Sequence, residues 1–273
     1  MTSSPFTDST PTIRAFLGGS FDPVHEGHLQ MAMSVYQQLA ALLPPSYPSE
    51  SQSKALHVSL LPNARSPFKQ ESSDPSHRLA MLKLALLNTP LEISEIELWQ
   101  PPPVYTIDTV RALRGRYPRD ILIFIMGADS AASLSRWKQG LELPHYAHLW
   151  VFTRQGSAVL EGRSIAELLP STLRPFITHN VKALLSPIAS IDSLTDNSAF
   201  EQPLTPTLTD LKWATNGRIY IDNTDIMAIS SSQIRQHLQG VPEPAADASM
   251  NLGKVLPPMV YDYIRQHALY CCG

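Results

Sequence analysis

Short apolar stretches alternate along the chain with longer segments in which apolar residues recur at helical spacing. The stretches typical of strands occupy residues 13–17, 55–61, 91–98, 121–126, 149–153 and 218–221. The segments with helical spacing occupy residues 27–43, 77–87, 106–117, 230–239 and 257–267. Strands that alternate with helices predict a mostly parallel sheet with helices on both of its faces.

Local signals sharpen two of the helix boundaries. Pro44 and Pro45 end the first helix. Asp74 and Pro75 begin the second, with Asp74 as N-cap and Pro75 at the first helical position. The expected architecture is a Rossmann-like, doubly wound α/β fold. Such folds bind ligands at the carboxyl ends of their strands, so functional residues are expected just after the strands.

We expect one domain from residue 13 to residue 273, preceded by a polar, disordered tail at residues 1–12. Two segments interrupt the alternation of strands and helices. Residues 44–54 are rich in Pro and Ser and predict a surface insertion. Residues 157–216 carry scattered Pro, Ser and Thr and predict an inserted, irregular subdomain.

The composition of the chain limits which binding partners and which cellular compartment are expected for the protein. Hydrophobic residues make up 43% and charged residues 16%, as in folded domains, and a net charge of −3 argues against a nucleic-acid partner. No transmembrane run and no N-terminal signal are recognised. Cys271 and Cys272 are adjacent, so they predict neither a long-range disulfide nor a metal site. A cytoplasmic protein without a membrane partner is expected, and a homo-oligomer is left open.

The strongest motif is residues 18–28, Gly-Gly-Ser-Phe-Asp-Pro-Val-His-Glu-Gly-His, which follows a predicted strand and opens a predicted helix. Gly18 and Gly19 let backbone N–H groups approach an anion closely, and the helix N-terminus adds partial positive charge. We expect these glycines, with Ser20 and Phe21, to form a phosphate-binding loop.

His25 and His28 lie three residues apart, so both can occupy one side of the first helical turn. There they can donate to phosphate oxygens and stabilise charge that develops during phosphoryl chemistry. The spacing excludes the metalloprotease motif, and the glycines match neither a Walker A nor a dinucleotide fingerprint. A structural role is the alternative for a lone His, but the complete string favours a phosphate site.

This string resembles the His-x-Gly-His signature of the nucleotidyltransferase superfamily. Residues 229–235, Ile-Ser-Ser-Ser-Gln-Ile-Arg, resemble its second signature, with Ser232 in place of the usual Thr. Ser230, Ser231 and Ser232 can cap a helix and offer donors to an anion, and Arg235 can reach the β- and γ-phosphates of ATP. Alone, the segment predicts an ordinary capped helix. Its pairing with the first signature favours ATP binding.

Further segments resemble bacterial nicotinate-nucleotide adenylyltransferases and lie at residues 61–69, 105–106, 127–130, 137, 148–154 and 256–264. The resemblance extends over residues 13–270, apart from the two insertions. Within residues 61–69, the family often has His before Lys69, whereas this chain has Phe68.

The resemblance implies roles for several residues. Asp129 would accept hydrogen bonds from ribose hydroxyls, and Trp137 would stack on the pyridine ring. Thr106 and its backbone N–H would meet the nicotinate carboxylate, with the ring between Trp137 and the segment Tyr105–Thr106. Lys69 would reach phosphates. The structural alternatives are a helix cap for Asp129 and Thr106, packing for Trp137 and simple solvation for Lys69.

The implied reaction transfers the adenylyl group of ATP to nicotinate mononucleotide and yields deamido-NAD and pyrophosphate. Mg²⁺ is expected with ATP, held by phosphates and water, because no carboxylate cluster predicts a dedicated metal site. Three alternatives stay open. The acceptor could be nicotinamide mononucleotide or phosphopantetheine, the reaction could be a cytidylyl transfer, or the protein could be a catalytically silent nucleotide sensor.

Overall fold

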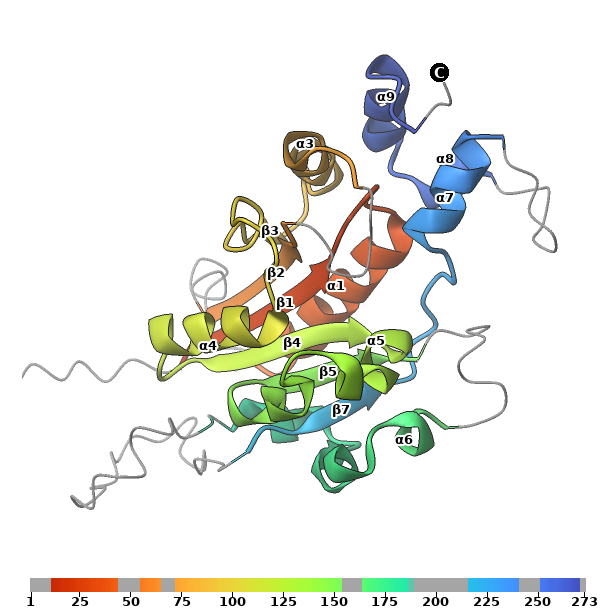
Figure 1. Cartoon of the computed structure of the whole chain (residues 1–273). Coiled ribbons are helices and arrows are strands. Elements are labelled where there is room, and N and C mark those ends of the chain that lie inside the picture. The colour runs from red at the N-terminus through yellow and green to blue at the C-terminus, as the bar shows by residue number, and fades with distance from the viewer. Residues whose placement is uncertain are drawn as a thin grey trace, which may run out of the picture.

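A seven-stranded parallel sheet with the strand order β3-β2-β1-β4-β5-β7-β6 forms the centre of the molecule (Figure 1). This computed structural model describes residues 11–43, 55–64, 72–153, 164–186, 188, 216–240 and 251–270. The strands are β1 (Ile13–Gly19), β2 (Leu56–Pro62), β3 (Glu92–Ile93), β4 (Ile121–Gly127), β5 (His148–Phe152), β6 (Ile177–Thr178) and β7 (Ile219–Asp222). The predicted doubly wound α/β fold is confirmed.

Helices cover both faces of this sheet. The α-helices of the described residues are α1 (Glu26–Ala40), α3 (Pro75–Ala85), α4 (Thr106–Arg116), α5 (Ala128–Ala132), α6 (Ile165–Leu168), α7 (Ser231–Leu238), α8 (Leu252–Val255) and α9 (Pro258–Gln266). The same residues form the 3-10 helices η1 (Leu134–Arg136), η2 (Gly140–His145), η3 (Ser171–Phe176) and η4 (Val181–Leu185). No helix in the described parts of the chain is long and apolar enough to span a membrane.

Strand β4 shows how the sequence divides the core between the two faces. Successive side chains of a strand point to opposite faces, and residues 121–126 are apolar at every position, as a strand buried on both sides requires. Ile123 and Ile125 belong to the same buried cluster as residues of α1, α3 and α9, whereas Leu122 and Phe124 belong to a second cluster with residues of α4 and α5. Figure 1 shows α4 in front of the sheet and α1 behind it.

The sheet edges differ from the prediction in two places. The strand expected at residues 91–98 is limited to Glu92–Ile93, because the chain turns over the next residues and buries Leu98 without pairing. Within residues 157–216, the strand β6 was not predicted, and it pairs with β7 at the other edge of the sheet. It has only two residues, which is too short for an alternating pattern to indicate a strand. The predicted start of α3 is confirmed, since the Asp74 side chain accepts from Ser76 N and Pro75 occupies the first turn.

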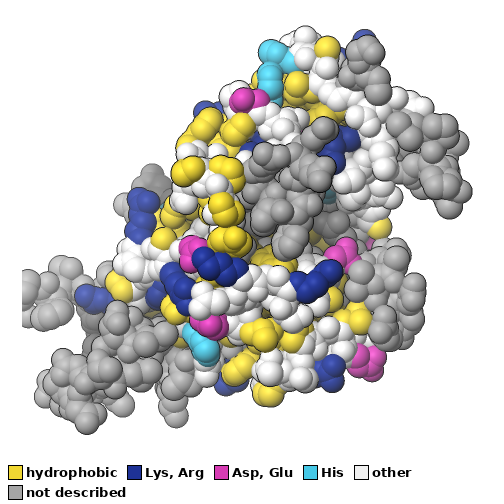
Figure 2. Space-filling view, in the orientation of Figure 1, with side chains coloured by type: hydrophobic (Ala, Val, Ile, Leu, Met, Phe, Trp, Pro, Cys, Tyr) yellow, Lys and Arg dark blue, Asp and Glu magenta, His cyan; other side chains and the backbone are white. Residues whose placement is uncertain are grey.

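The chain reverses its winding direction between β1 and β4. From β1 the order runs through β2 to β3, and from β4 it runs through β5 toward the opposite edge. The loops after β1 and β4 therefore diverge and leave a crevice at the carboxyl ends of the strands, where doubly wound folds bind ligands. On the face shown in Figure 2, Lys and Arg side chains lie among Asp and Glu side chains across the middle of the view, where α4 and α5 lie in Figure 1.

Candidate active site

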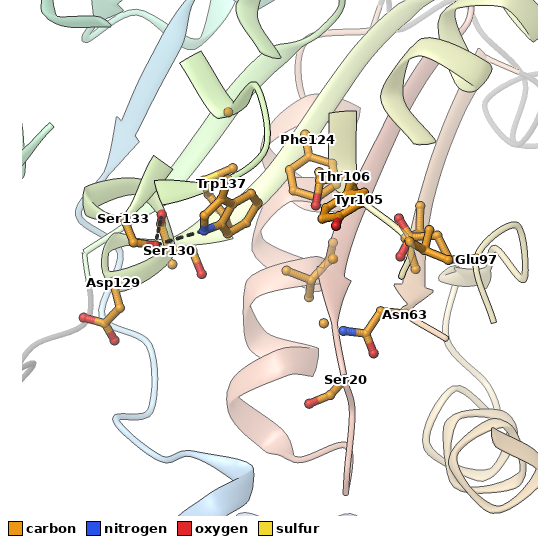
Figure 3. A pocket seen from close by; sticks show the side chains of 18 of the residues that line it. Ser20, Asn63, Glu97, Tyr105, Thr106, Phe124, Asp129, Ser130, Ser133 and Trp137 are labelled. Atoms are coloured by element: carbon orange, nitrogen blue, oxygen red, sulfur yellow. Dashed lines mark hydrogen bonds between the residues drawn. The ribbon is translucent and has the colours of Figure 1, made fainter. Parts of the chain in front are cut away.

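A cavity of about 900 Å³ occupies the crevice at the carboxyl ends of β1, β2 and β4 (Figure 3). The structure brings most predicted site residues into its wall: Gly18, Gly19, Ser20, His25, His28, Tyr105, Thr106, Asp129, Trp137, Ser230, Ser231 and Ser232. Two predicted residues, Phe21 and Arg235, lie behind this wall. Lys69 lies outside the described residues. We call the part around His25, His28 and Ser230–Ser232 the phosphate end, and the part around Tyr105 and Trp137 the ring end.

The end of β1 needs small residues where it passes the cavity. A side chain at Gly18 would place its Cβ 2.6 Å from the ring of Phe124, and one at Gly19 would meet the ring of Phe21 at 3.0 Å. Phe21 itself has a left-handed backbone, with φ of 49°, which is uncommon for a residue other than glycine. Its ring is fully buried in the core, so Phe21 can serve the predicted phosphate-binding loop only through its backbone.

His25 and His28 form a stacked pair at the start of α1. Their ring centroids lie 3.7 Å apart, and the ring planes are inclined by 25°. His25 N donates to His28 Nδ1 at 3.4 Å, so the neutral His28 ring carries its proton on Nε2. The Phe21 ring meets His28 edge-on at 4.9 Å and limits its movement. The predicted pair thus presents imidazole edges beside a helix N-terminus.

Helix α7 is fixed to the loop after β1 by its first residues. Ser230 caps the helix by accepting from Gln233 N, and Ser231 Oγ donates to Pro23 O at 2.9 Å. Arg235 Nη1 donates to Asp22 O at 2.6 Å, and Nη2 contacts Ser232 Oγ at 3.4 Å. A guanidinium has five N–H donors, so Arg235 can brace this loop and still direct donors toward a phosphate.

Arg78 supports the site, and this role was not predicted from the sequence. Its fully buried guanidinium donates to Ser20 O at 3.0 Å, Asn63 O at 2.8 Å and Ala64 O at 2.6 Å. It therefore ties the loop after β1 to the loop after β2. Burial lowers the pKa of Arg78, although a guanidinium stays charged over any working pH. A signal existed, since helical spacing places Arg78 on the same face as the apolar residues Met81 and Leu82.

The ring end is formed by the start of α4 and the segment after α5. Figure 3 shows Trp137 directed toward Phe124 and Thr106. Trp137 Nε1 donates to Ser133 Oγ at 3.1 Å, which sets the orientation of the indole. Tyr105 is the N-cap of α4 and Thr106 its first residue, so the capping alternative for Thr106 is wrong. The first N–H groups of a helix have no partner within it, so Thr106 brings backbone donors to the cavity wall.

Asp129 lies in the first turn of α5, whose N-cap is Gly127, so the capping alternative for Asp129 is also wrong. Asp129 is one of the residues that line the cavity. Six polar lining residues were not predicted as site residues: Asn63, Glu97, Ser130, Ser133, Arg136 and Lys138. Lys138 Nζ lies 4.4 Å from the centroid of the Tyr105 ring and 3.1 Å from Asp108 Oδ2, so it links the two sides of the ring end.

Among the described residues that line the cavity, Glu97 has the one buried carboxyl group, with 5% of its surface exposed. Burial raises its pKa, and the neighbouring Thr109 side chain opposes that shift. Within the described ranges, no three His, Cys, Asp or Glu side chains come together in a way that could hold a metal ion.

Comparisons with known proteins agree with this geometry. The sequence model of the cytidylyltransferase-like family matches residues 16–237. An Idiomarina loihiensis protein named "Probable nicotinate-nucleotide adenylyltransferase" is 31% identical over 260 residues, covering 94% of this chain and 99% of the relative. A Sodalis glossinidius protein of the same name is 33% identical over 273 residues, covering 96% of this chain and 99% of the relative.

A solved structure, "Plasmodium falciparum nicotinic acid mononucleotide adenylyltransferase complexed with NaAD", has the same fold. Its TM-score is 0.57 at 16% identity, covering 95% of this chain and 97% of that chain. Together the sheet, the loop after β1 and the family match define a nucleotidyltransferase. Within that class, the chain belongs to the nicotinate-nucleotide adenylyltransferase family, which confirms the resemblance drawn from its motifs.

Proposed function

We propose that this enzyme transfers the adenylyl group of ATP to nicotinate mononucleotide, giving deamido-NAD and pyrophosphate in NAD biosynthesis. The observation that carries the proposal is one cavity with two differently equipped ends. The phosphate end presents paired imidazoles and two helix N-termini, and the ring end presents an indole beside backbone donors. The names of the relatives, which span nearly the whole chain, support the same acceptor.

At the phosphate end, His25 and His28 stabilise the charge that builds on the phosphate oxygens as the bond to pyrophosphate breaks. The 5′-phosphate of the acceptor attacks the α-phosphorus in line, and pyrophosphate leaves. This nucleophile is already an anion at neutral pH, so no strong base is required, and positioning supplies much of the rate. Ser230–Ser232 and Arg235 hold the β- and γ-phosphates, while Gly18–Ser20 contribute backbone donors.

At the ring end, Trp137 stacks on the pyridine ring, and the N–H group of Thr106 donates to the nicotinate carboxylate. Tyr105 closes this side of the cavity, and Asp129 accepts from ribose hydroxyls. Lys69, outside the described residues, stays a predicted phosphate ligand.

Nucleotidyltransferases use a metal ion together with their nucleotide, and we propose Mg²⁺ here. Mg²⁺ keeps several water ligands and binds readily through substrate phosphates. A cavity wall that presents serines, imidazoles and N–H groups fits a metal that arrives on the triphosphate. When bound, the ion neutralises charge on the phosphates. A cytoplasmic location and the absence of a nucleic-acid partner stay predictions from the sequence, which leaves a homo-oligomer open.

The proposal is tested with purified enzyme, ATP and the two pyridine mononucleotides. Donors that fit a carboxylate meet the NH₂ group of an amide poorly, and each unpaired buried group costs about 1–3 kcal/mol. We therefore expect kcat/KM to favour nicotinate mononucleotide by at least roughly a hundredfold. Equal values for both acceptors would show that the ring end reads the ring and ignores its substituent. Faster turnover with phosphopantetheine, or with CTP in place of ATP, would assign a different reaction.

A further inference from the structure

The chain bends back on itself after α9. Helix α9 ends at Gln266, and both Ala268 and Tyr270 adopt the left-handed backbone conformation, with φ of 48° and 64°. Residues other than glycine rarely adopt this conformation, so surrounding contacts must hold it. Leu269 N donates to Ile264 O at 3.0 Å and closes the turn. This hook, residues 267–270, directs Tyr270 toward the interior.

The Tyr270 hydroxyl donates to Asp22 Oδ1 at 2.6 Å, across 248 positions in the sequence. Asp22 is buried, and its other carboxylate oxygen accepts from Ser73 N at 3.0 Å. Burial and the neighbouring Asp22 carboxylate raise the pKa of Tyr270 well above its usual range, so the hydroxyl stays a donor. Both oxygens of Asp22 are thus engaged, one by the hook and one by the segment before α3.

Asp22 also connects to the groups proposed to act on phosphates. Its carbonyl oxygen accepts from Arg235 Nη1 at 2.6 Å. Its neighbour Phe21 has the strained φ of 49°, and the Phe21 ring packs edge-on against His28. A shift of Asp22 would therefore move Arg235 and relax the packing of His28 together. Neither Tyr270 nor Asp22 lines the cavity.

From this geometry we propose that Tyr270 is a positioning residue for adenylyl transfer: its hydrogen bond fixes Asp22, and Asp22 fixes Arg235 and the Phe21–His28 contact. The C-terminal hook is then part of the support of the active site. Because the effect is measured on adenylyl transfer, the role of Tyr270 rests on the proposed function.

The test compares Tyr270→Phe with Tyr263→Phe in the full-length enzyme. Tyr263 is a matched control, since it belongs to α9 and its hydroxyl bonds His77 Nδ1 of α3 at 2.9 Å, not a group of the loop after β1. We expect Tyr270→Phe to lower kcat about tenfold, the size of one lost hydrogen bond to a charged group. KM for the mononucleotide should stay within about twofold, and Tyr263→Phe should keep a near-normal kcat.

A double-mutant cycle with Asp22→Asn tests the route of the effect. If Tyr270 acts through Asp22, adding Tyr270→Phe to Asp22→Asn should lower kcat by much less than tenfold. Melting temperatures of all variants establish that assays are run on folded enzyme. Calorimetry of ATP binding without acceptor gives a second readout, in which Tyr270→Phe weakens ATP binding and Tyr263→Phe does not.

Equal effects of the two Tyr→Phe variants, or independent effects in the cycle, would overturn the proposal. So would a Tyr270→Phe enzyme that melts earlier but turns over normally when folded. The assay of the wild-type enzyme with ATP and nicotinate mononucleotide tests the proposed function separately. If the wild type used another acceptor, the role of Tyr270 would still be decided by the ratio of kcat between the two Tyr→Phe variants and by their affinities for ATP.

Discussion

At the phosphate end of the cavity, side chains are held by hydrogen bonds to backbone groups in the interior, whereas at the ring end they are held by contacts nearer the surface. Arg78 is fully buried and donates to loop carbonyls, and Arg235 and Ser231 both donate to the backbone of residues 22–23. Lys138 and Asp108, which join the two sides of the ring end, keep 47% and 49% of their side chains exposed.

The difference follows from what each end has to do. Phosphate chemistry needs donors fixed in place before charge develops, because reorganisation during the reaction would cost rate. Binding of a flat ring needs mainly area and a few donors, and it tolerates some movement. We therefore expect substitutions at the phosphate end to lower kcat and substitutions at the ring end to raise KM for the acceptor.

His28→Ala at the phosphate end should have the largest effect. Loss of a positioned donor to developing charge costs about 10²–10³ in turnover, and we expect kcat to fall by that factor with little change in folding. Steady-state kinetics and thermal melting measure both quantities. His145→Ala, which removes an exposed imidazole outside the cavity wall, is the control. Near-normal turnover of His28→Ala would remove the imidazole pair from the mechanism.

Arg235→Lys tests whether geometry or charge matters at the phosphate end. A lysine keeps the charge but loses the fork that spans Asp22 O and Ser232 Oγ. A hydrogen bond to a charged group is worth about 1.5–3 kcal/mol, so kcat/KM for ATP should fall about tenfold or more. Mononucleotide affinity, measured by calorimetry, should change little. Arg265→Lys on the exposed face of α9 is the control, and equal loss of both affinities would contradict the assignment to ATP.

Much of this comparison could be predicted from the sequence, because the motif residues follow strands. Parallel strands bring their carboxyl ends to one edge, so Gly18, His28, Thr106 and Asp129 had to converge. Continuous apolar runs such as residues 121–126 carried the strand signal. The edge strand β6 has only two residues and carried no comparable signal.

The supports of the site could not be predicted in the same way. Arg78 reaches Ser20 across 58 positions, and Tyr270 reaches Asp22 across 248. Such contacts depend on how α3 and the hook pack against the loop after β1, which no local pattern encodes. An Arg on the apolar face of a helix can indicate that its side chain is buried, but it does not indicate which groups the side chain bonds.

Trp137→Ala at the ring end should have a smaller effect of a different kind. Stacking between aromatic rings is worth about 0.5–1.5 kcal/mol beyond the area it buries, so KM should rise about tenfold for both the acid and the amide mononucleotide. Little change in kcat is expected, because the ring lies away from the reacting phosphates. Trp99→Ala is the control, since that side chain is 58% exposed. A large fall in kcat with unchanged KM would show that the two ends are not separate.

Glu97→Gln should have the smallest effect, and it concerns stability at the ring end. Burial raises the pKa of Glu97 above the ordinary value of 4.5, so the folded state holds a proton that the unfolded state has released. Stability therefore falls as the pH rises from 4.5 to the raised pKa of the folded state.

The neutral Gln of the Glu97→Gln variant has no such cost. The advantage of Gln in melting temperature should be absent below pH 4.5, grow through that interval and then level off above it. Glu95→Gln, two positions away and exposed, should show no such trend. A pH-independent difference between Glu97→Gln and wild type would mean that Glu97 stays ionised in the cavity, and the ring end would then carry a buried negative charge close to the carboxylate it is proposed to bind.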